Sequence, residues 1–449
     1  MKKSLSLILI SLFMITASAQ NNVKTGWKFG GALPTTTFST DLGFQYGAFV
    51  EFYNYGDGSR FPDFFDHTYT EVSHFTKGSG IFRMMYESNH LIPGVHMTSD
   101  LSYLPDAATD FYGFNGYEAV YNSDWMKYDD TPSDPYKSAM FYRFQRNQFR
   151  FKNDFQGKLS GEHINWSAGF AFQKFKVSSV NIDKLNKGRK DILPTVTEQP
   201  GLYELYRDSL GLISANEADG GWVNTLKFGV EWDSRDNKPN PMKGMWTEMG
   251  VELSPKFMGS DWGFARLYFI HRQYFTLIPR DLAFVYRVDY QSTISGSVPF
   301  FYQSQVVTSR LTGATNEGLG GASTLRGVLR NRVLGDGFVY ANIELRWKPV
   351  HFSLLNQDCY IGLSAFYDFG MITRKIKLPS DLETTFSENM KNYAFQDFFN
   401  PGGEKLHQDA GISIFPVINQ NFVIAIDIGK AFNAQDGNIG FSIGLNYLF

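Results

Sequence analysis

The chain has 449 residues, of which 16% are aromatic and 19% charged, with 42 Phe, 24 Tyr and 42 Gly. Its formal net charge of −3 gives no basis for nucleic-acid binding, and its single cysteine, Cys359, excludes an internal disulfide and a cysteine-based zinc site. The mean hydropathy of −0.26 fits a membrane β-barrel, because such a barrel shows lipid only every second residue.

Residues 1–19 are predicted to form a secretory signal peptide. Two lysines precede an apolar run from Leu5 to Ile15, and Ala17-Ser18-Ala19 supplies the small residues of a cleavage site. No cysteine follows that could carry a lipid, and no later segment has the run of about eighteen apolar residues that a transmembrane helix requires. An exported, aromatic-rich chain of this kind is predicted to reside in a Gram-negative outer membrane.

The remaining chain, residues 20–449, is predicted to be a single domain made of strands. Apolar and polar residues alternate in about sixteen segments, and an even strand number is usual for single-chain bacterial barrels. The predicted fold class is therefore all-β, a transmembrane antiparallel β-barrel. Its strands are expected near residues 25–33, 41–54, 66–77, 80–92, 94–105, 138–157, 162–180, 221–234, 244–256, 261–276, 281–294, 336–348, 358–371, 406–416, 421–430 and 438–449.

The links between these strands differ in length. Short links such as 77–80 and 279–281 are predicted to be periplasmic turns, because the periplasmic turns of such barrels are short. Longer segments are predicted to be extracellular loops, namely 106–137, 181–220, 295–335 and 372–405.

The segment from Gly313 to Pro349 joins a polar glycine-rich loop to an alternating strand. The loop contains Leu325-Arg326-Gly327 and further glycines at positions 318, 320 and 321. In the strand, one face is apolar, whereas the other carries Tyr340, Asn342, Glu344 and Arg346. A packed core would not accept these charges, so the polar face is predicted to line a wet lumen.

The C-terminal segment has the same alternation. One face is predicted to meet lipid and consists of Phe441, Ile443, Leu445, Tyr447 and Phe449. The final aromatic residue resembles the sorting signal by which outer-membrane barrels are recognised for assembly.

Four motifs in a shared order resemble the BamA/TamA superfamily, also called the bacterial surface antigen family. They are the Arg326-Gly327 loop with the strand after it, Phe366-Tyr367-Asp368-Phe369-Gly370, the glycine strand Ala410–Ile414, and the turn Trp232–Asp236 with Pro241 and Gly244. The resemblance covers roughly 220–449 of the sequence. It implies a barrel with an arginine-glycine loop folded into its lumen.

The resemblance also implies a luminal latch, in which Arg326 and Gly327 fold inward and Arg326 pairs with Asp368. The inward direction of Asp368 follows independently from the alternation of its strand. Glu344 and Asp427, also on predicted inward faces, are second candidates for the same network. The alternative is that these charges merely line a wet channel, as charges inside wide barrels commonly do.

In this family the first and last strands pair poorly and form a seam that can open sideways. The corresponding segments here are Gly26–Ala32 and Gly440–Phe449, and the candidate seam residues are Gly26, Gly30, Gly31, Gly440, Gly444 and Phe449. Glycine-containing strands are also simply weak strands, so both interpretations stay open. Typical members carry POTRA domains before the barrel. Alternation starting at Gly26 predicts a POTRA-less branch, in which substrate delivery is either absent or supplied by a separate periplasmic or lipoprotein partner.

The sequence bears on three functional classes. The resemblance favours an outer-membrane assembly or translocation barrel whose partners are outer-membrane lipids and a polypeptide client. The alternative is a passive channel or structural accessory barrel of a larger complex. An enzyme is not predicted, because the sequence has no Gly-x-Ser-x-Gly elbow and its eight histidines are scattered. No cofactor and no metal site are predicted. Residues 111–116 resemble a loop of barrels fused to patatin-type phospholipases.

Overall fold

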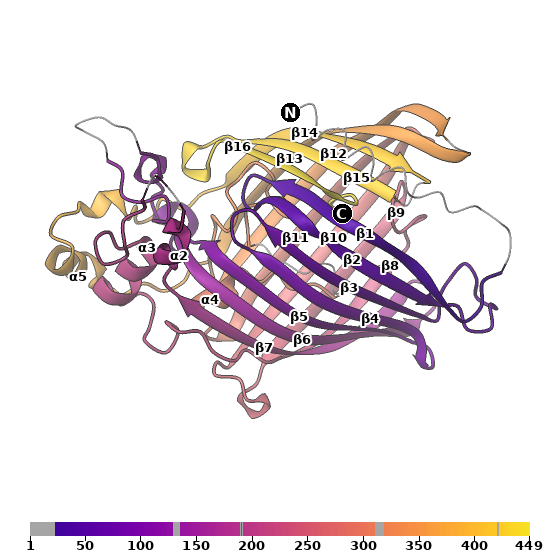
Figure 1. The fold of residues 1–449 in the computed structure, drawn as a ribbon, viewed down its shortest axis with the longest axis horizontal. Coiled ribbons are helices and arrows are strands. Elements are labelled where there is room, and N and C mark those ends of the chain that lie inside the picture. Colours follow the sequence, from indigo (N-terminus) through magenta and orange to yellow (C-terminus); the bar gives the residue numbers. More distant parts are fainter. Residues whose placement is uncertain are drawn as a thin grey trace.

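The computed structural model describes residues 23–128, 135–188, 190, 192–309, 318–354, 356–419 and 422–449, so the predicted signal peptide lies outside the described residues. In the described part, sixteen antiparallel strands form a closed barrel in which β1 also pairs with β16 (Figure 1). The predicted fold class and strand number are confirmed. The strands are β1 Trp27–Ser39, β2 Gly43–Asn54, β3 Asp66–Phe75, β4 Gly80–Ile92, β5 Val95–Asp110, β6 Arg143–Ser160, β7 Ile164–Ser178, β8 Thr225–Asp233, β9 Gly244–Ser254, β10 Phe264–Ile278, β11 Leu282–Gly296, β12 Gly337–Leu354, β13 Gln357–Arg374, β14 His407–Ile418, β15 Phe422–Ala431 and β16 Ile439–Leu445.

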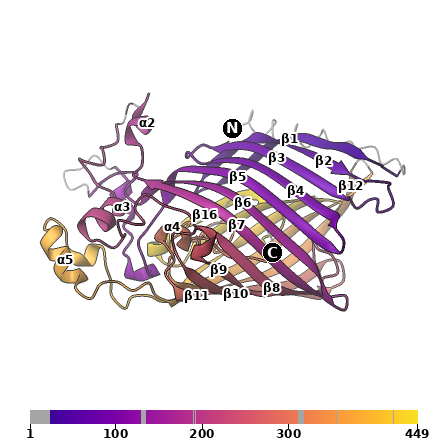
Figure 2. The same cartoon turned by 90° about the horizontal axis from the view of Figure 1, so that it is seen from below.

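Short helices interrupt the connections that follow odd-numbered strands. These connections share one end of the barrel, here called the loop end, and the helices gather there in both views (Figure 1 and Figure 2). The other end is the turn end. No helix in the described ranges is long and apolar enough to cross a membrane. The helices are η1 Gly116–Glu118, η2 Ser123–Met126, α2 Ile182–Asn186, α3 Leu202–Glu204, η3 Leu205–Ser209, η4 Lys256–Met258, α4 Phe300–Gln303, α5 Leu382–Asn389, η5 Phe395–Asp397 and η6 Ala434–Asp436.

One predicted turn lies at the wrong end. Residues 77–80 follow β3, an odd-numbered strand, and therefore lie at the loop end with the long loops, whereas 279–281 follow β10 at the turn end. The Ala107 N–H donates to the Gly78 carbonyl at 3.3 Å, which fixes the first turn against the loop end of β5. Antiparallel strands alternate in direction, so strand number decides the end and turn length does not.

The alternation of β12 produces a polar wall inside and an apolar wall outside. Asn342, Glu344 and Arg346 are buried in the lumen, whereas Leu345 and Trp347 are half exposed on the outer face. Because successive side chains of a strand point to opposite sides, this pattern is the expected result of a sheet closed around a polar lumen.

Aromatic side chains fill the loop end of the barrel. A single buried cluster, called the cap, combines residues from the connections after β5, β7, β11 and β13. Each such ring buries a large apolar area, so the cap is a packed core rather than a set of independent loops. Its members include Phe111, Phe114, Phe141, Tyr206, Phe300, Phe301, Phe398 and Phe399.

Candidate functional site

Arg326 lies at the centre of a buried ion network in the lumen. Its Nε and Nη2 donate to the two carboxylate oxygens of Asp368, each at 2.8 Å, and its Nη1 donates to Glu344 at 2.7 Å. Asp427 lies 3.7 Å from the same Nη1. The planar guanidinium suits this role because it grips one carboxylate with two parallel bonds and still reaches a second. The ring of Phe366 packs on a face of the Arg326 guanidinium, with its centroid 3.5 Å from Arg326 Cζ.

The loop carrying Arg326 rests on the barrel wall through glycines. A Cβ on Gly327 would fall 2.6 Å from the Cβ of Asp409, and one on Gly429 would fall 2.8 Å from the Gly327 nitrogen. A Cβ on Gly440 would meet the Arg326 carbonyl oxygen. Backbone therefore packs directly on backbone, which only glycine allows. Gly440, predicted as a seam residue, lies under the latch.

Asp409 belongs to this network although the sequence interpretation missed it. It lies directly opposite Asp368 in the pairing of β13 with β14, and both side chains are fully buried. Two neighbouring ionised carboxylates repel each other, and the positive charge of Arg326 offsets this repulsion for both Asp368 and Asp409. A signal existed in the sequence, because Asp409 directly precedes the Ala410–Ile414 motif on the inward face.

The loop also reaches the opposite wall. Arg330 donates to Asp106 of β5 at 3.0 Å. The neighbouring Arg332, fully buried, donates to the carbonyl oxygens of Gly116, Ala119 and Gln435 at 2.9, 3.0 and 2.6 Å. The latch thus joins the wall of β12–β15 to β5 and to the cap.

Ionisable side chains at the loop end are also held by specific partners. Burial raises the pKa of Tyr117, and the adjacent Asp436, which accepts a hydrogen bond from the Tyr117 hydroxyl, raises it further. Burial raises the pKa of Glu217 too, although hydrogen bonds from the Phe300 N–H at 3.0 Å and from Ser214 Oγ at 3.1 Å oppose that effect. The described residues contain no cluster of His, Cys, Asp or Glu suited to a metal ion.

The barrel closes through a very short contact between β1 and β16. These strands pair at two positions, Phe38 with Ile443 and Ser39 with Ser442, whereas β1 pairs with β2 along its whole length. The edge of β1 from Trp27 to Thr37 therefore has no β16 partner in the described pairing. Gly30 and Gly31 lie on this stretch and Gly26 directly precedes it, so none of the three pairs with β16 in the described pairing, and their place in a lateral seam stays a prediction.

Pro34 does not end β1, because its missing N–H points to the edge of the strand that faces away from β2. The strand was expected to stop before Pro34, but it continues to Ser39. The Thr40 N–H donates to the Phe441 carbonyl of β16 at 2.9 Å. Backbone N–H groups alternate in direction along a strand, so Pro34 faces the β16 side of β1, as Thr40 does. Its missing N–H therefore removes no hydrogen bond between β1 and β2.

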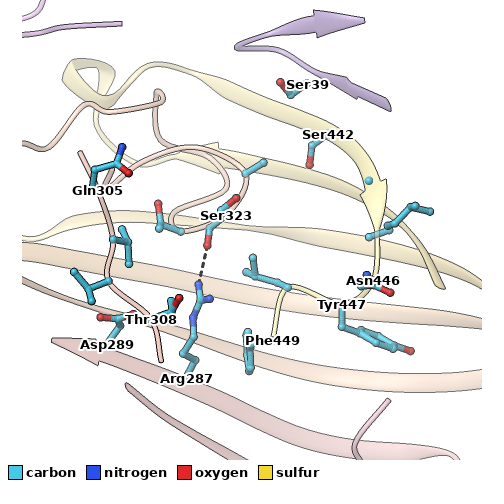
Figure 3. A pocket seen from close by; sticks show the side chains of 18 of the residues that line it. Ser39, Arg287, Asp289, Gln305, Thr308, Ser323, Ser442, Asn446, Tyr447 and Phe449 are labelled. Carbon is cyan, nitrogen blue, oxygen red and sulfur yellow. Dashed lines mark hydrogen bonds between the residues drawn. The ribbon is translucent and has the colours of Figure 1, made fainter. Parts of the chain in front are cut away.

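The last four residues leave the barrel wall. Asn446 adopts φ of 69°, and residues 446–449, called the tail, then turn into the lumen (Figure 3). Tyr447 and Phe449 are each only 9% exposed. The prediction that they face lipid is therefore wrong, and Phe449 is not part of the seam. Gly444 stays in β16 and pairs with Ala425.

Comparisons with known proteins now decide the family. The pattern of the Omp85 superfamily domain matches residues 104–447, which is most of the chain. The chain belongs to the Omp85 superfamily. A search of curated proteins finds no match.

Two solved Omp85-like barrels resemble the fold. BamA from Haemophilus ducreyi lacking POTRA domains 1–3 aligns with a TM-score of 0.54 at 14% identity, covering 94% of this chain and 71% of that protein. CdiB from Escherichia coli aligns with a TM-score of 0.53 at 9% identity, covering 93% of this chain and 63% of that protein. At these identities the likeness concerns the fold alone. β-Barrels of this superfamily reside in the Gram-negative outer membrane.

Proposed function

We propose that this Omp85 barrel assembles polypeptides into the outer membrane through the seam between β1 and β16. The observation that carries the proposal is the edge of β1 from Trp27 to Thr37, which β16 leaves without a partner. Unpaired backbone groups cost several kcal/mol each in lipid, so such an edge favours pairing with an incoming strand.

The cap favours sideways release over export through the loop end. Buried aromatic residues of four connections pack together there, and Arg332 holds the cap to the latch. A passive channel or an exporter needs an open path at this end, whereas an insertase does not. The luminal cavity, about 870 Å³, is lined by Thr37–Ser39 of β1 and Ser442–Leu445 of β16. A chain inside the lumen would therefore meet the seam directly.

Clients must also be delivered to the turn end. We propose that a separate periplasmic or lipoprotein partner does this, and that the latch keeps the β12–β15 wall rigid while the seam opens. Support for the latch comes from the three contacts of Arg326 with Asp368 and Glu344, which join loop and wall. The catalytic chemistry of an enzyme has no part in this scheme.

A disulfide across the seam tests the proposal. In a Cys359→Ala background, Ser39→Cys and Ser442→Cys place two cysteines opposite each other in β1 and β16. The matched control is Ser364→Cys with Ser413→Cys, an inward serine pair across β13 and β14. The oxidised seam variant should lose client insertion into proteoliposomes and regain it on reduction, while the control keeps it. Equal insertion by both oxidised proteins would refute the seam mechanism.

A further inference from the structure

His407, the first residue of β14, lies buried between two carboxylates at the loop end. Its Nδ1 lies 2.6 Å from Asp436 Oδ1, and its Nε2 lies 3.4 Å from Glu404 Oε2. The Tyr117 ring stacks on the imidazole, with ring centroids 3.9 Å apart. The side chains of His407 and Asp436 are 0% exposed and that of Glu404 is 4% exposed. The group of Tyr117, Arg332, Glu404, His407 and Asp436 is here called the histidine node.

The histidine node joins connections that are far apart in the sequence. Tyr117 belongs to η1 after β5, Glu404 to the connection after β13, and Asp436 to η6 after β15. Glu404 also accepts hydrogen bonds from the backbone N–H groups of Tyr117 at 2.9 Å and Ile372 at 3.0 Å. Asp436 accepts one from the Tyr117 hydroxyl. Three loop-end connections are therefore held to one another around a single imidazole.

The contacts of His407 require its charged form. An ionised carboxylate only accepts hydrogen bonds, so both ring nitrogens must carry a proton to bond Asp436 and Glu404 together. A neutral imidazole has one donor nitrogen and one acceptor nitrogen, and the acceptor would face a carboxylate oxygen. Loss of the proton therefore breaks one of the two contacts.

Buried charges in the histidine node balance only when His407 is protonated. Arg332 is fully buried, with its Nε 3.9 Å from Asp436 Oδ1. Arg332 and the imidazolium then supply two positive charges against the two carboxylates. Without the proton on His407, one buried carboxylate has no compensating charge, which is strongly unfavourable. Arg332 also bonds the Gly116 carbonyl beside Tyr117, so the same balance holds the latch loop to η1.

Other charged groups around the histidine node leave this balance unchanged. They are two acids and two bases, namely Glu118, Asp409, Lys375 and Lys405. Glu118 and Lys375 pair with each other at 2.7 Å. Lys405 is exposed, so water screens it, and Asp409 faces the latch two residues along β14. On the β13 side, the position opposite His407 is Gly370, which carries no charge.

We propose that protonation of His407 keeps the loop end closed and that loss of this proton lets it open. The protonated node holds η1, η6 and the connection after β13 together, whereas the neutral node releases one of its carboxylates. Because the folded loop end binds this proton more tightly than the unfolded chain does, its contribution is complete below about pH 6.5 and is lost as pH rises above it. The switch acts on the loop end and does not depend on the assembly function proposed for the seam.

Hydrogen exchange tests the proposal in the full chain, reconstituted in lipid vesicles and followed by mass spectrometry. Exchange rates are corrected for the intrinsic effect of pH. Protection of residues 115–120, which include the Tyr117 amide bonded to Glu404, should fall about tenfold between about pH 6 and about pH 8.5. Peptides covering Phe300, whose amide is bonded to Glu217, serve as a separate reporter of the loop end.

The variant Asp436→Asn separates the proton from the packing. It removes one carboxylate, so Arg332 alone balances Glu404 when His407 is neutral. The Asn side chain can accept from His407 Nδ1 and donate to the Tyr117 hydroxyl. Protection of residues 115–120 should therefore persist to about pH 8.5 in this variant. A variant that merely damaged the packing would lose protection instead.

The variant His407→Gln cannot take up a proton, so protection of residues 115–120 should be low and independent of pH. The matched control is His351→Gln, which removes an exposed histidine paired with Asp281 at the turn end and should keep the native pH dependence. Exchange at Phe300 should follow neither variant.

Protection of residues 115–120 that does not change with pH in the native chain would overturn the proposal. A native pH dependence in Asp436→Asn or in His407→Gln would overturn it too, because another group would then titrate. If His407→Gln does not fold, the comparison between the native chain and Asp436→Asn decides the matter by itself.

Discussion

Replacing Arg326 by methionine would remove the cation from a buried cluster of carboxylates. Asp368 would lose its two side-chain hydrogen bonds of 2.8 Å, and Asp409 would remain opposite it in a fully buried position. Glu344 would keep Arg346 as a partner at 2.6 Å. The main loss is therefore the positive charge that compensates Asp368 and its buried neighbours, and removing one partner of such a buried charge pair is expected to cost about 3–5 kcal/mol of stability.

A graded series of variants separates charge from geometry. Arg326→Lys keeps the positive charge but cannot form the paired bonds to Asp368, so it should cost about 2 kcal/mol, near the worth of one hydrogen bond to a charged group. In Asp368→Asn with Arg326→Met both charges of the pair are gone, so the double variant should be more stable than Arg326→Met alone. The assay is the urea dependence of barrel unfolding in lipid vesicles, followed by tryptophan fluorescence. Equal unfolding midpoints for native, lysine and methionine variants would refute the latch as a structural element.

Three further predictions follow from other parts of the barrel. Gly440→Ala should destabilise the barrel by about 1–3 kcal/mol because its Cβ meets the Arg326 carbonyl oxygen, whereas Gly444→Ala, with open space at its Cβ, should not change the unfolding midpoint in urea. Arg332→Gln should expose residues 111–128 to protease, because it leaves the buried carbonyls of Gly116 and Ala119 without their hydrogen-bond donor. The control Arg207→Gln removes only an exposed ion pair and should not change the digestion rate. Equal digestion rates for the two variants would contradict the role of Arg332 in holding this connection. Burial raises the pKa of Glu217, so the folded cap binds this proton more tightly than the unfolded chain, and cap stability should fall as pH rises from about 4.5 through the folded pKa. Glu217→Gln should flatten that pH dependence in hydrogen exchange at Phe300, and an unchanged slope would show that another group titrates.

Some errors of the sequence interpretation were avoidable. The short length of the turn at residues 77–80 predicts a periplasmic position, yet its place after the third strand puts it at the same end as the long loops. Asp409 was missed although it lies on the same inward face as Asp368 in the neighbouring strand. Both facts follow from counting strands and from period-2 alternation, so they were available without a structure.

The sequence by itself determined about sixteen strands and the polar lumen, and its resemblance to a known family supplied the pairing of Arg326 with Asp368. Strand alternation is a local property, and the order of the motifs pointed to the partner. Only the tertiary structure decided where β1 meets β16 and where the tail goes. Alternating aromatic residues look the same whether they face lipid or fill a pocket. For Tyr447 and Phe449 the outcome depended on Arg346, about a hundred residues earlier in the chain, because cation–π and hydrogen-bond partners distant in sequence stabilise the inward position.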